Sequence, residues 1–445
     1  MADQVRYWNK EIETMPRTKL QDLQVRRFKE LIKRCYTKVK HYKEKFDELG
    51  ITPDDFQTLD DLSKFPITVK TDLRDNYPFG MFAEPLSNIV RIHASSGTTG
   101  KPTVVGYTKH DIDDVWTECM ARGLVAGGVK KGDVVQNAYG YGLFTGGLGF
   151  HYGCERVGAS VIPISGGNTD RQVMLFQDFG STVLTCTPSF AAYLGELIKQ
   201  QNVDPSQIKL HTGIFGAEFW TENMREKLET LFSGLNESGT FRALDVYGLS
   251  EIAGPGVSND CIFKHGLHVW EDHFFPEIID SSTHEAVAPG ESGELVFSTI
   301  TKEGIPLIRY DTKDISSLEY EKCECGRTCV RHAKITGRTD DMMKIKGINV
   351  FPSQIEFVLM KIPGVAEHYE IVVERDILDK IKVRVELTPE TFSDQMSELE
   401  GLKSTIEKEM YNTLQINVNV ELVPPNTIPR SVGKAKRVID LRTET

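Results

Sequence analysis

The N-terminal part of the chain carries apolar residues at helical spacing. Between residue 5 and about residue 50 they form one stripe among charged positions, which is typical of an amphipathic helix with one buried face. The stripe consists of Leu20, Leu23, Val25, Phe28, Leu31, Ile32, Cys35 and Tyr36. This pattern predicts a helical lead-in before the main fold.

From about residue 90, short β-rich runs alternate with amphipathic helical segments. That alternation is typical of parallel α/β layers, in which strands and helices follow one another along the chain. We expect strands at 161–164, 182–186, 211–215 and 242–247, and helices at 171–179 and 189–200.

After Gly290 the pattern changes to strands and turns, which predicts a smaller β unit. Past Gly337 a mixed order of helices and strands predicts a compact α+β domain, entered through a short polar stretch suited to a hinge. The fold class is therefore α/β, with a large N-terminal domain over 1–339 and a small mobile C-terminal α+β domain over 340–445. The elements expected in this half are strands at 294–300, 306–310, 369–373, 381–387 and 417–423, and helices opening near 352 and spanning 393–411.

Composition narrows the class of protein. The 445 residues are 40% hydrophobic and 26% charged, which is ordinary for a globular chain of two or three units. A formal net charge of −12 argues against general nucleic-acid binding. Residues 1–17 lack the apolar core of a signal peptide, and no run of about 18 apolar residues is present to span a bilayer. We therefore expect a cytoplasmic protein without nucleic-acid or membrane partners.

Residues 95–103, hereafter the phosphate loop, read Ser-Ser-Gly-Thr-Thr-Gly-Lys-Pro-Thr. Backbone N–H groups, hydroxyls and one ammonium in such a loop suit a polyphosphate. The loop is not a Walker A motif, because Ser95 stands where the first glycine is needed and Pro102 follows the lysine. A flexible surface loop is the alternative reading.

Two further candidate sites follow expected strands, where α/β folds usually bind ligands. Asp245, Tyr247, Gly248 and Glu251 surround the end of the strand at 242–247, and Glu251 is a candidate Mg²⁺ ligand because nucleotide-bound magnesium takes few protein carboxylates. A helix-capping role is the alternative for this glutamate. Residues 216–218 begin with the small residues Gly216 and Ala217, which would let a flat ring approach the backbone. A plain turn between a strand and a helix is the alternative.

The second half of the chain adds two charged stretches. Asp311 and Asp314 close the expected strand at 306–310, and either carboxylate can accept hydrogen bonds from ribose hydroxyls. A solvated turn is the alternative. Residues 429–437 form a basic loop that contains Lys434, which could also be a solvated basic tail.

These motifs, in this order, resemble the adenylate-forming superfamily of acyl-CoA synthetases, adenylation domains and luciferases. The resemblance covers the chain from about residue 90 to its C-terminus. The phosphate loop, the stretch from Tyr247 to Glu251, residues 337–356 and Gly433-Lys434 look like its phosphate, magnesium, hinge and catalytic-lysine motifs. More narrowly, residues 266–280, 309–310 and 337–352 resemble its phenylacetate-CoA ligase branch.

The resemblance implies an ATP-dependent ligase that makes an acyl-adenylate, releases pyrophosphate, and passes the acyl group to coenzyme A. It implies ATP, Mg²⁺ and coenzyme A as cofactors or co-substrates, with Lys434, Glu251 and Thr98 as catalytic residues and Asp340 as the hinge. The basic loop is one residue shorter than the common form, so Lys436 stays open as the catalytic lysine. The nucleotide-binding residues implied are Ser95, Ser96, Gly97, Thr99, Gly100, Lys101, Gly216, Ala217, Glu218, Asp245, Tyr247, Gly248, Asp314 and Arg338.

The acid substrate has one candidate pocket. Residues 139–147 place glycines beside aromatic side chains, so that Tyr139 and Phe144 could flank one flat ring. Aromatic clusters are more often core, and the family resemblance favours the pocket. We expect phenylacetate or a close arylacetate, with another aryl acid such as indoleacetate as the alternative.

Eight cysteines are present, and half of them occur with histidines in two short clusters. Cys261 and His268 in one cluster, with Cys323 and Cys325 in the other, predict a structural zinc site. Whether His265 replaces His268, and whether Cys329 joins, stays open, and reduced free thiols are the alternative.

Two functions of other classes are alternatives to the ligase. The spacing Gly140-x-Gly142-x-x-Thr145 faintly suggests a dinucleotide-binding oxidoreductase, but the third glycine is displaced and no helix-opening pattern is evident after it. A non-catalytic nucleotide-binding relative is the other, although the joint presence of Lys101, Glu251, Asp314 and Lys434 argues against a decayed site. The oligomeric state is open, with a homodimer possible.

Overall fold

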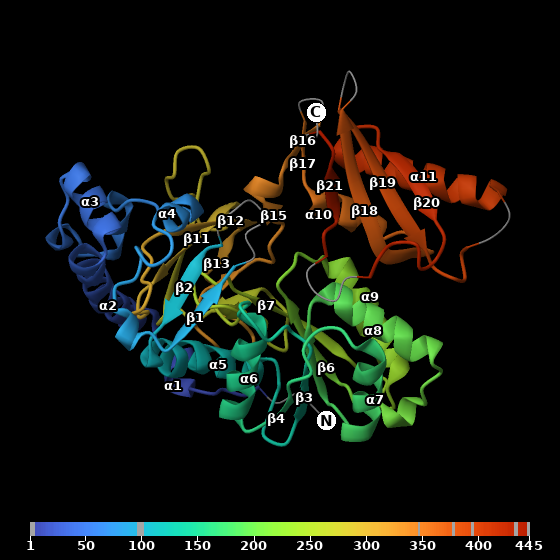
Figure 1. Cartoon of the computed structure of the whole chain (residues 1–445), viewed down its shortest axis with the longest axis horizontal. Helices are drawn as coiled ribbons and strands as arrows, with labels where there is room; N and C mark the ends of the chain where they lie inside the picture. Colours follow the sequence, from blue (N-terminus) through green and yellow to red (C-terminus); the bar gives the residue numbers. More distant parts are fainter. Residues whose placement is uncertain are drawn as a thin grey trace.

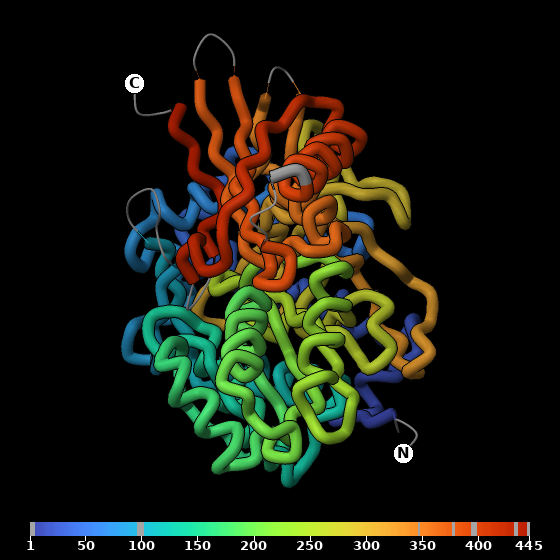
Figure 2. Tube along the Cα trace, turned by 90° about the vertical axis from the view of Figure 1, so that its right-hand side faces the viewer, coloured from blue at the N-terminus to red at the C-terminus, as the bar shows by residue number. Residues whose placement is uncertain are grey.

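The computed structural model describes residues 5–95, 102–345, 348–375, 379–392, 396–430 and 435–442. A large body carries the N-terminal part of the chain, and a smaller C-terminal body lies above α8 (Pro188–Gln200) and α9 (Glu222–Leu235) (Figure 1). Figure 2 shows the same stacking from the side. The fold class expected from the sequence is confirmed.

The helical lead-in consists of α2 (Arg17–Lys38) and α3 (Lys40–Leu49), as predicted. Five residues of its apolar stripe are buried, namely Leu20, Phe28, Leu31, Ile32 and Cys35, and the other three are half-buried. The other helices are α1 (Lys10–Glu13), α4 (Lys70–Asp75), α5 (Thr117–Ala126), α6 (Gly146–Val157), α7 (Thr169–Phe179), α10 (Pro352–Leu359) and α11 (Met396–Leu414). The helix α6 opens directly after Thr145, so the sequence-based view that no helix begins there was wrong.

A nine-stranded sheet forms the centre of the large body, in the order β13-β14-β9-β8-β7-β6-β5-β3-β4. The five strands β3 to β7 pair in parallel, as the alternating pattern predicted, whereas β8, β9, β13 and β14 add antiparallel pairs. The strands are β3 (Val134–Asn137), β4 (Ser160–Ile162), β5 (Val183–Cys186), β6 (Thr212–Gly216), β7 (Arg242–Tyr247), β8 (Ser258–Asn259), β9 (Leu267–Val269), β13 (Leu318–Glu319) and β14 (Arg331–His332).

The smaller β unit is a four-stranded antiparallel sheet in the order β10-β11-β12-β15. Its strands are β10 (Phe274–Ile279), β11 (Gly293–Thr299), β12 (Tyr310–Ser316) and β15 (Gly337–Arg338), so it begins before Gly290. A separate hairpin of β1 (Arg91–Ala94) and β2 (Val104–Tyr107) carries the phosphate loop.

The expected strand at 306–310 was wrong, because β12 starts only at Tyr310. The apolar residues there are buried, but side-chain hydroxyls bind their backbone N–H groups in place of a strand partner. Ile308 N donates to Tyr42 Oη at 3.1 Å, and Arg309 N donates to Ser298 Oγ at 2.9 Å. Arg309 also has a φ of 47°, which interrupts extended backbone.

The C-terminal body is built on a four-stranded sheet in the order β20-β19-β18-β21, packed on α10 and α11. Its strands are β18 (Val365–Arg375), β19 (Asp379–Leu387), β20 (Asn419–Val423) and β21 (Val438–Asp440), with a preceding hairpin of β16 (Met343–Ile345) and β17 (Ile348–Val350). The sequence pattern predicted the longer elements and missed the hairpin and β21. None of the helices in the described ranges has the length and apolar character needed to cross a bilayer.

Candidate active site

Several described candidate residues follow parallel strands of the nine-stranded sheet. The parallel strands β3, β5, β6 and β7 all end at one edge of this sheet, so the residues that follow them converge there. Tyr139 follows β3, the turn 216–218 closes β6, and Tyr247 ends β7.

The two ends of the phosphate loop are joined. Ser95 N donates to Thr103 O at 2.9 Å, and Thr103 N donates to Ser95 Oγ at 3.3 Å. The hairpin of β1 and β2 therefore closes the base of the loop. The candidate residues Ser96, Gly97, Thr98, Thr99, Gly100 and Lys101 lie outside the described residues.

Tyr247, Asp314 and Arg338 form one connected group. Tyr247 Oη donates to Asp314 Oδ2 at 2.6 Å, and Arg338 Nη1 donates to Asp314 Oδ1 at 2.8 Å. Burial, with the adjacent Asp314 carboxylate, raises the pKa of Tyr247 well above its usual value, so the phenol is a donor at neutral pH. The phenol and the guanidinium therefore fix the orientation of the Asp314 carboxylate.

Glu251 lies in a turn between β7 and β8 with its side chain almost fully buried. Lys70 Nζ, at the start of α4, lies 3.5 Å from Glu251 Oε1. Lys302 Nζ donates to the Glu251 backbone carbonyl at 3.0 Å. One ammonium group thus pairs with the Glu251 carboxylate and the other holds its backbone, and a carboxylate oxygen is a ligand that Mg²⁺ takes in proteins. The sequence-based reading missed both lysines.

Buried donors also fix the rest of this turn, residues 248–256. Tyr107 Oη donates to Ser250 O at 3.1 Å, and Trp116 Nε1 donates to Pro255 O at 2.9 Å. A Cβ on Gly248 would lie 1.8 Å from the carbonyl oxygen of Gly254, so only glycine fits there. The irregular backbone is therefore held in one shape by side chains from distant parts of the chain.

The turn after β6 combines close packing with a charged side chain. A Cβ on Gly216 would lie 2.1 Å from Val246 O, and Ala217 has a φ of 70°. The Glu218 carboxylate accepts from Ser189 N at 2.7 Å and from Ala435 N at 2.9 Å. Both oxygens are thus bound to backbone amides, and one of these amides belongs to the C-terminal body.

Asp245 lies within β7, before its C-terminal end, and is buried. Lys334 Nζ is 3.7 Å from Asp245 Oδ2 and 3.3 Å from Glu222 Oε1, and it sits 3.6 Å above the centre of the Trp220 ring. Burial raises the pKa of Asp245 to about 6 and lowers the pKa of Lys334. Burial thus acts against the charged form of both partners.

The two candidate substrate residues lie on either side of Gly146. A Cβ on Gly146 would be 2.6 Å from Phe144 Cε1 and 3.3 Å from Tyr139 Cδ1. Tyr139 is buried with one face stacked on Phe150 at 5.1 Å, whereas Phe144 is 44% exposed. Both rings therefore lie close to the Gly146 backbone, where a side chain would clash with Phe144.

The predicted zinc ligands come together. The ligand atoms of Cys261, His268, Cys323 and Cys325 all lie within 4.8 Å of one another, and all four residues are buried. Cys261 Sγ is 3.8 Å from Cys323 Sγ, and Cys325 Sγ is 3.4 Å from His268 Nε2. Tetrahedral zinc with ordinary bond lengths gives about 3.8 Å and about 3.6 Å for these separations.

The two alternative ligands are also placed. His265 is largely exposed and pairs with Glu324 at 3.5 Å, so it lies outside the cluster. Cys329 Sγ lies 3.4 Å from His268 Nδ1, on the side of the ring that faces away from Cys325. A metal on Nε2 would leave Nδ1 as the N–H donor to this sulfur.

Asp340 is the predicted hinge, and Lys434 and Lys436 are the two candidates for the catalytic lysine. Asp340 accepts from Arg338 Nε at 2.9 Å and from Nη2 at 3.0 Å, and its side chain is half exposed. Lys434 lies outside the described residues, and Lys436 is described.

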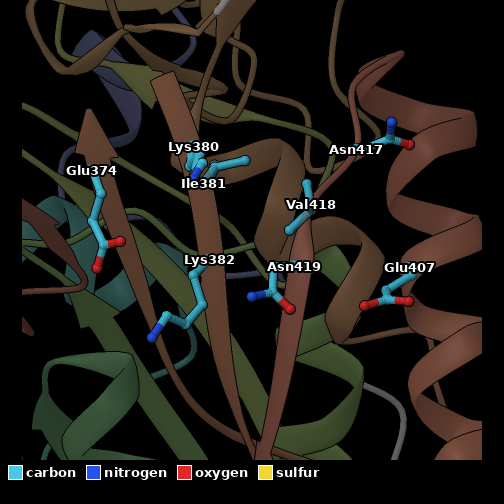
Figure 3. A pocket seen from close by; sticks show the side chains of 8 residues that line it. All are labelled: Glu374, Lys380, Ile381, Lys382, Glu407, Asn417, Val418 and Asn419. Carbon is cyan, nitrogen blue, oxygen red and sulfur yellow. The ribbon is translucent and has the colours of Figure 1, made fainter. Parts of the chain in front are cut away.

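An open cavity of about 440 Å³ lies in the C-terminal body, away from these residues (Figure 3). Its lining is mixed in charge and comes from β18, β19, β20 and α11, with the residues Glu374, Lys380, Ile381, Lys382, Glu407, Asn417, Val418 and Asn419. It shares no residue with the candidate nucleotide site.

Comparison with known proteins defines the class. Residues 53–301 match the AMP-binding enzyme family, and residues 347–442 match the AMP-binding enzyme C-terminal domain. The phenylacetate-coenzyme A ligase of Thermus thermophilus is 48% identical over 97% of this chain and 99% of its own. That of Escherichia coli is 47% identical over 97% of both chains. The chain is an AMP-binding enzyme, and within that class it belongs to the phenylacetate-coenzyme A ligase family.

Solved structures give the same fold. A 2-hydroxyisobutyryl-CoA ligase in the postadenylation state superposes with a TM-score of 0.91 at 27% identity, over 99% of this chain and 93% of its own. The same ligase in its thioesterification state gives 0.72, over 100% and 94%. Coverage is nearly equal, so the two scores differ because the arrangement of the chain differs.

Proposed function

We propose that this chain joins phenylacetate to coenzyme A at the expense of ATP. In the first half-reaction a carboxylate oxygen of the acid attacks the α-phosphorus, forming phenylacetyl-adenylate and releasing pyrophosphate. In the second, the coenzyme A thiol loses its proton and attacks the acyl carbon, forming the thioester and releasing AMP. The near full-length identity of 47–48% to phenylacetate-coenzyme A ligases carries the proposal.

The geometry supports a role for each described site residue. Glu251, held by Lys70 and Lys302, would ligate Mg²⁺, which would neutralise negative charge on the nucleotide. Asp314, oriented by Tyr247 and Arg338, would accept the ribose hydroxyls. These groups position the reactants and stabilise charge, which is the main work of a protein in phosphoryl and nucleotidyl transfer.

The other roles are assigned from the sequence motifs. Backbone groups of the turn 216–218, with Asp245 and Gly248 nearby, would face the adenine, and Tyr139 and Phe144 would flank the aryl ring. The phosphate loop, including Thr98 and Lys101, would bind the leaving pyrophosphate. Lys434 would bridge the acid carboxylate and the nucleotide.

The two half-reactions need different surroundings, because a lysine that covers the nucleotide obstructs the approaching thiol. Rotation of a C-terminal domain over 340–445 about Asp340 would resolve this conflict. Arg338 donates to both Asp314 and Asp340, so one side chain joins the proposed ribose acceptor to the proposed hinge residue. This connection supports a hinge at Asp340.

The cysteine cluster fits a structural zinc ion held by Cys261, His268, Cys323 and Cys325, with Cys329 orienting the histidine. A bound zinc would tie the loop 323–329 to β9, and this loop also holds the N-terminus. Tyr7 Oη donates to Cys325 O at 2.6 Å, and Arg327 pairs with the buried Glu13 at 2.7 Å. The site would therefore stabilise the fold and take no part in the chemistry.

An ATP–pyrophosphate exchange assay with separate aryl acids tests the proposal. Exchange that depends on phenylacetate and Mg²⁺, with phenylacetyl-CoA appearing when coenzyme A is added, is the expected result. Nucleotide binding without exchange would instead indicate a non-catalytic relative.

A further inference from the structure

Two buried or partly buried carboxylates join the C-terminal body to the large body. Each accepts a hydrogen bond from a backbone N–H group on the other side of the boundary. Such bonds to an ionised acceptor are stronger than bonds between neutral groups, and they require a fixed geometry. They therefore favour one arrangement of the two bodies over others.

Glu218, on the turn after β6, provides the first of these contacts. Its Oε1 accepts from Ser189 N in the first turn of α8, and its Oε2 accepts from Ala435 N. Ala435 N belongs to the peptide bond that joins Ala435 to Lys434. The carboxylate thus fixes the backbone beside the expected catalytic lysine.

Glu356, on α10 of the C-terminal body, provides the second contact in the opposite direction. It is 1% exposed, and its Oε1 accepts from Thr221 N at 3.0 Å, at the N-cap of α9. Its Oε2 accepts from Tyr369 Oη at 2.8 Å, and Arg437 lies 3.7 Å away. Rotation of the C-terminal body would leave Thr221 N without this acceptor.

Arg437 connects the two contacts. Its guanidinium lies 4.2 Å from the centre of the Tyr369 ring, and Nη2 donates to Ser189 Oγ at 3.1 Å. Ser189 thus offers its N–H to Glu218 and its hydroxyl to Arg437. The start of α8 therefore contacts both Glu218 and Arg437.

We propose that Glu218 and Glu356 are positioning residues that hold the arrangement required for adenylate formation. This inference rests on the proposed function. The superposition on a postadenylation state at a TM-score of 0.91, against 0.72 for the thioesterification state, supports the link between these contacts and the first half-reaction.

The test measures the two half-reactions separately in E218Q and E356M. In E218Q one acceptor oxygen becomes a donor, so one of the two backbone amides loses its partner. In E356M neither Thr221 N nor Tyr369 Oη keeps its acceptor. We expect kcat for phenylacetate-dependent pyrophosphate exchange to fall roughly 10- to 100-fold. Thioester formation from supplied phenylacetyl-adenylate and coenzyme A should stay within about twofold, because that step needs the contacts broken.

A matched control is E390Q, which removes an interdomain ion pair between Lys199 and Glu390 whose side chains are both 65% exposed. It should leave both half-reactions unchanged. A raised KM for ATP with unchanged kcat in E218Q would overturn the proposal, since Glu218 would then be a nucleotide contact. Equal loss of both half-reactions would also overturn it. Failure of the proposed function is distinct, because the unmodified protein would show no exchange.

Discussion

Lys302 Nζ donates a hydrogen bond of 3.0 Å to the backbone carbonyl of Glu251, from a position that is almost fully buried. Burial lowers the pKa of Lys302 to about 8, and the nearby carboxylates of Asp111 and Glu251 oppose this shift. Tyr107 faces the ammonium with its ring at 4.8 Å. Burial lowers the pKa of His93, and the charges of Arg91 and Lys302 act in the same direction.

We expect pyrophosphate exchange to decline as the pH rises through about 8, because the neutral amine binds the Glu251 carbonyl less strongly and no longer compensates nearby negative charge. K302M should lose activity at all pH values and lack this decline. K302R should keep part of the activity and move the decline to higher pH, since a guanidinium remains charged. A decline unchanged in K302M would assign it to another group.

The same shift predicts an opposite trend in stability. The pKa of Lys302 is lower in the folded protein than in the unfolded chain, so the unfolded chain binds more protons between about pH 8 and 10.5. Relative to K302M, the free energy of unfolding should therefore rise by about 2 kcal/mol from about pH 7 to about pH 9.5. Denaturant unfolding of both proteins at the two pH values measures this, and a flat difference would contradict it.

Replacing Lys434 with alanine should cost about 3 to 4 kcal/mol in adenylate formation, because a donor aimed at developing charge is lost. Thioester formation from supplied adenylate should survive. K436A is the matched comparison on the same basic loop. If K436A shows this pattern and K434A does not, the catalytic lysine is Lys436.

Freshly purified protein should contain about one zinc per chain by elemental analysis. C323S should lose the metal and melt at a lower temperature, yet keep its kinetic constants while folded. C154A, which alters a buried thiol outside the cluster, should keep the zinc. Metal analysis that finds no zinc would refute the site.

Phenylacetate should exceed benzoate in kcat/KM by roughly 10- to 200-fold, because the missing methylene keeps the shorter acid from filling the space between Tyr139 and Phe144. F144A should raise KM for phenylacetate. F79A is a control, since Phe79 is 38% exposed and Phe144 is 44% exposed. A preference for benzoate, acetate or long-chain fatty acids would reject this pocket.

The helix α2 and the parallel strands could be predicted, because the regular spacing of their apolar residues indicates which face of each element is buried. Tyr247 and Asp314 could also be predicted from the sequence, since each lies in a short motif near a strand. Lys302 was not, because a single lysine 51 residues from Glu251 looks like any solvated lysine until the fold buries it. The contact between Glu218 and Ala435 could not be predicted for the same reason, since the two residues lie in different bodies.

Transfer of an oxygen atom tests the central claim most directly. Phenylacetate labelled with ¹⁸O in its carboxylate should place one labelled oxygen in the phosphate of AMP and none in pyrophosphate, because the acid attacks the α-phosphorus and leaves that oxygen behind when coenzyme A accepts the acyl group. Mass spectrometry of the products reads the label. Unlabelled AMP, or label in inorganic phosphate, would contradict an adenylate intermediate.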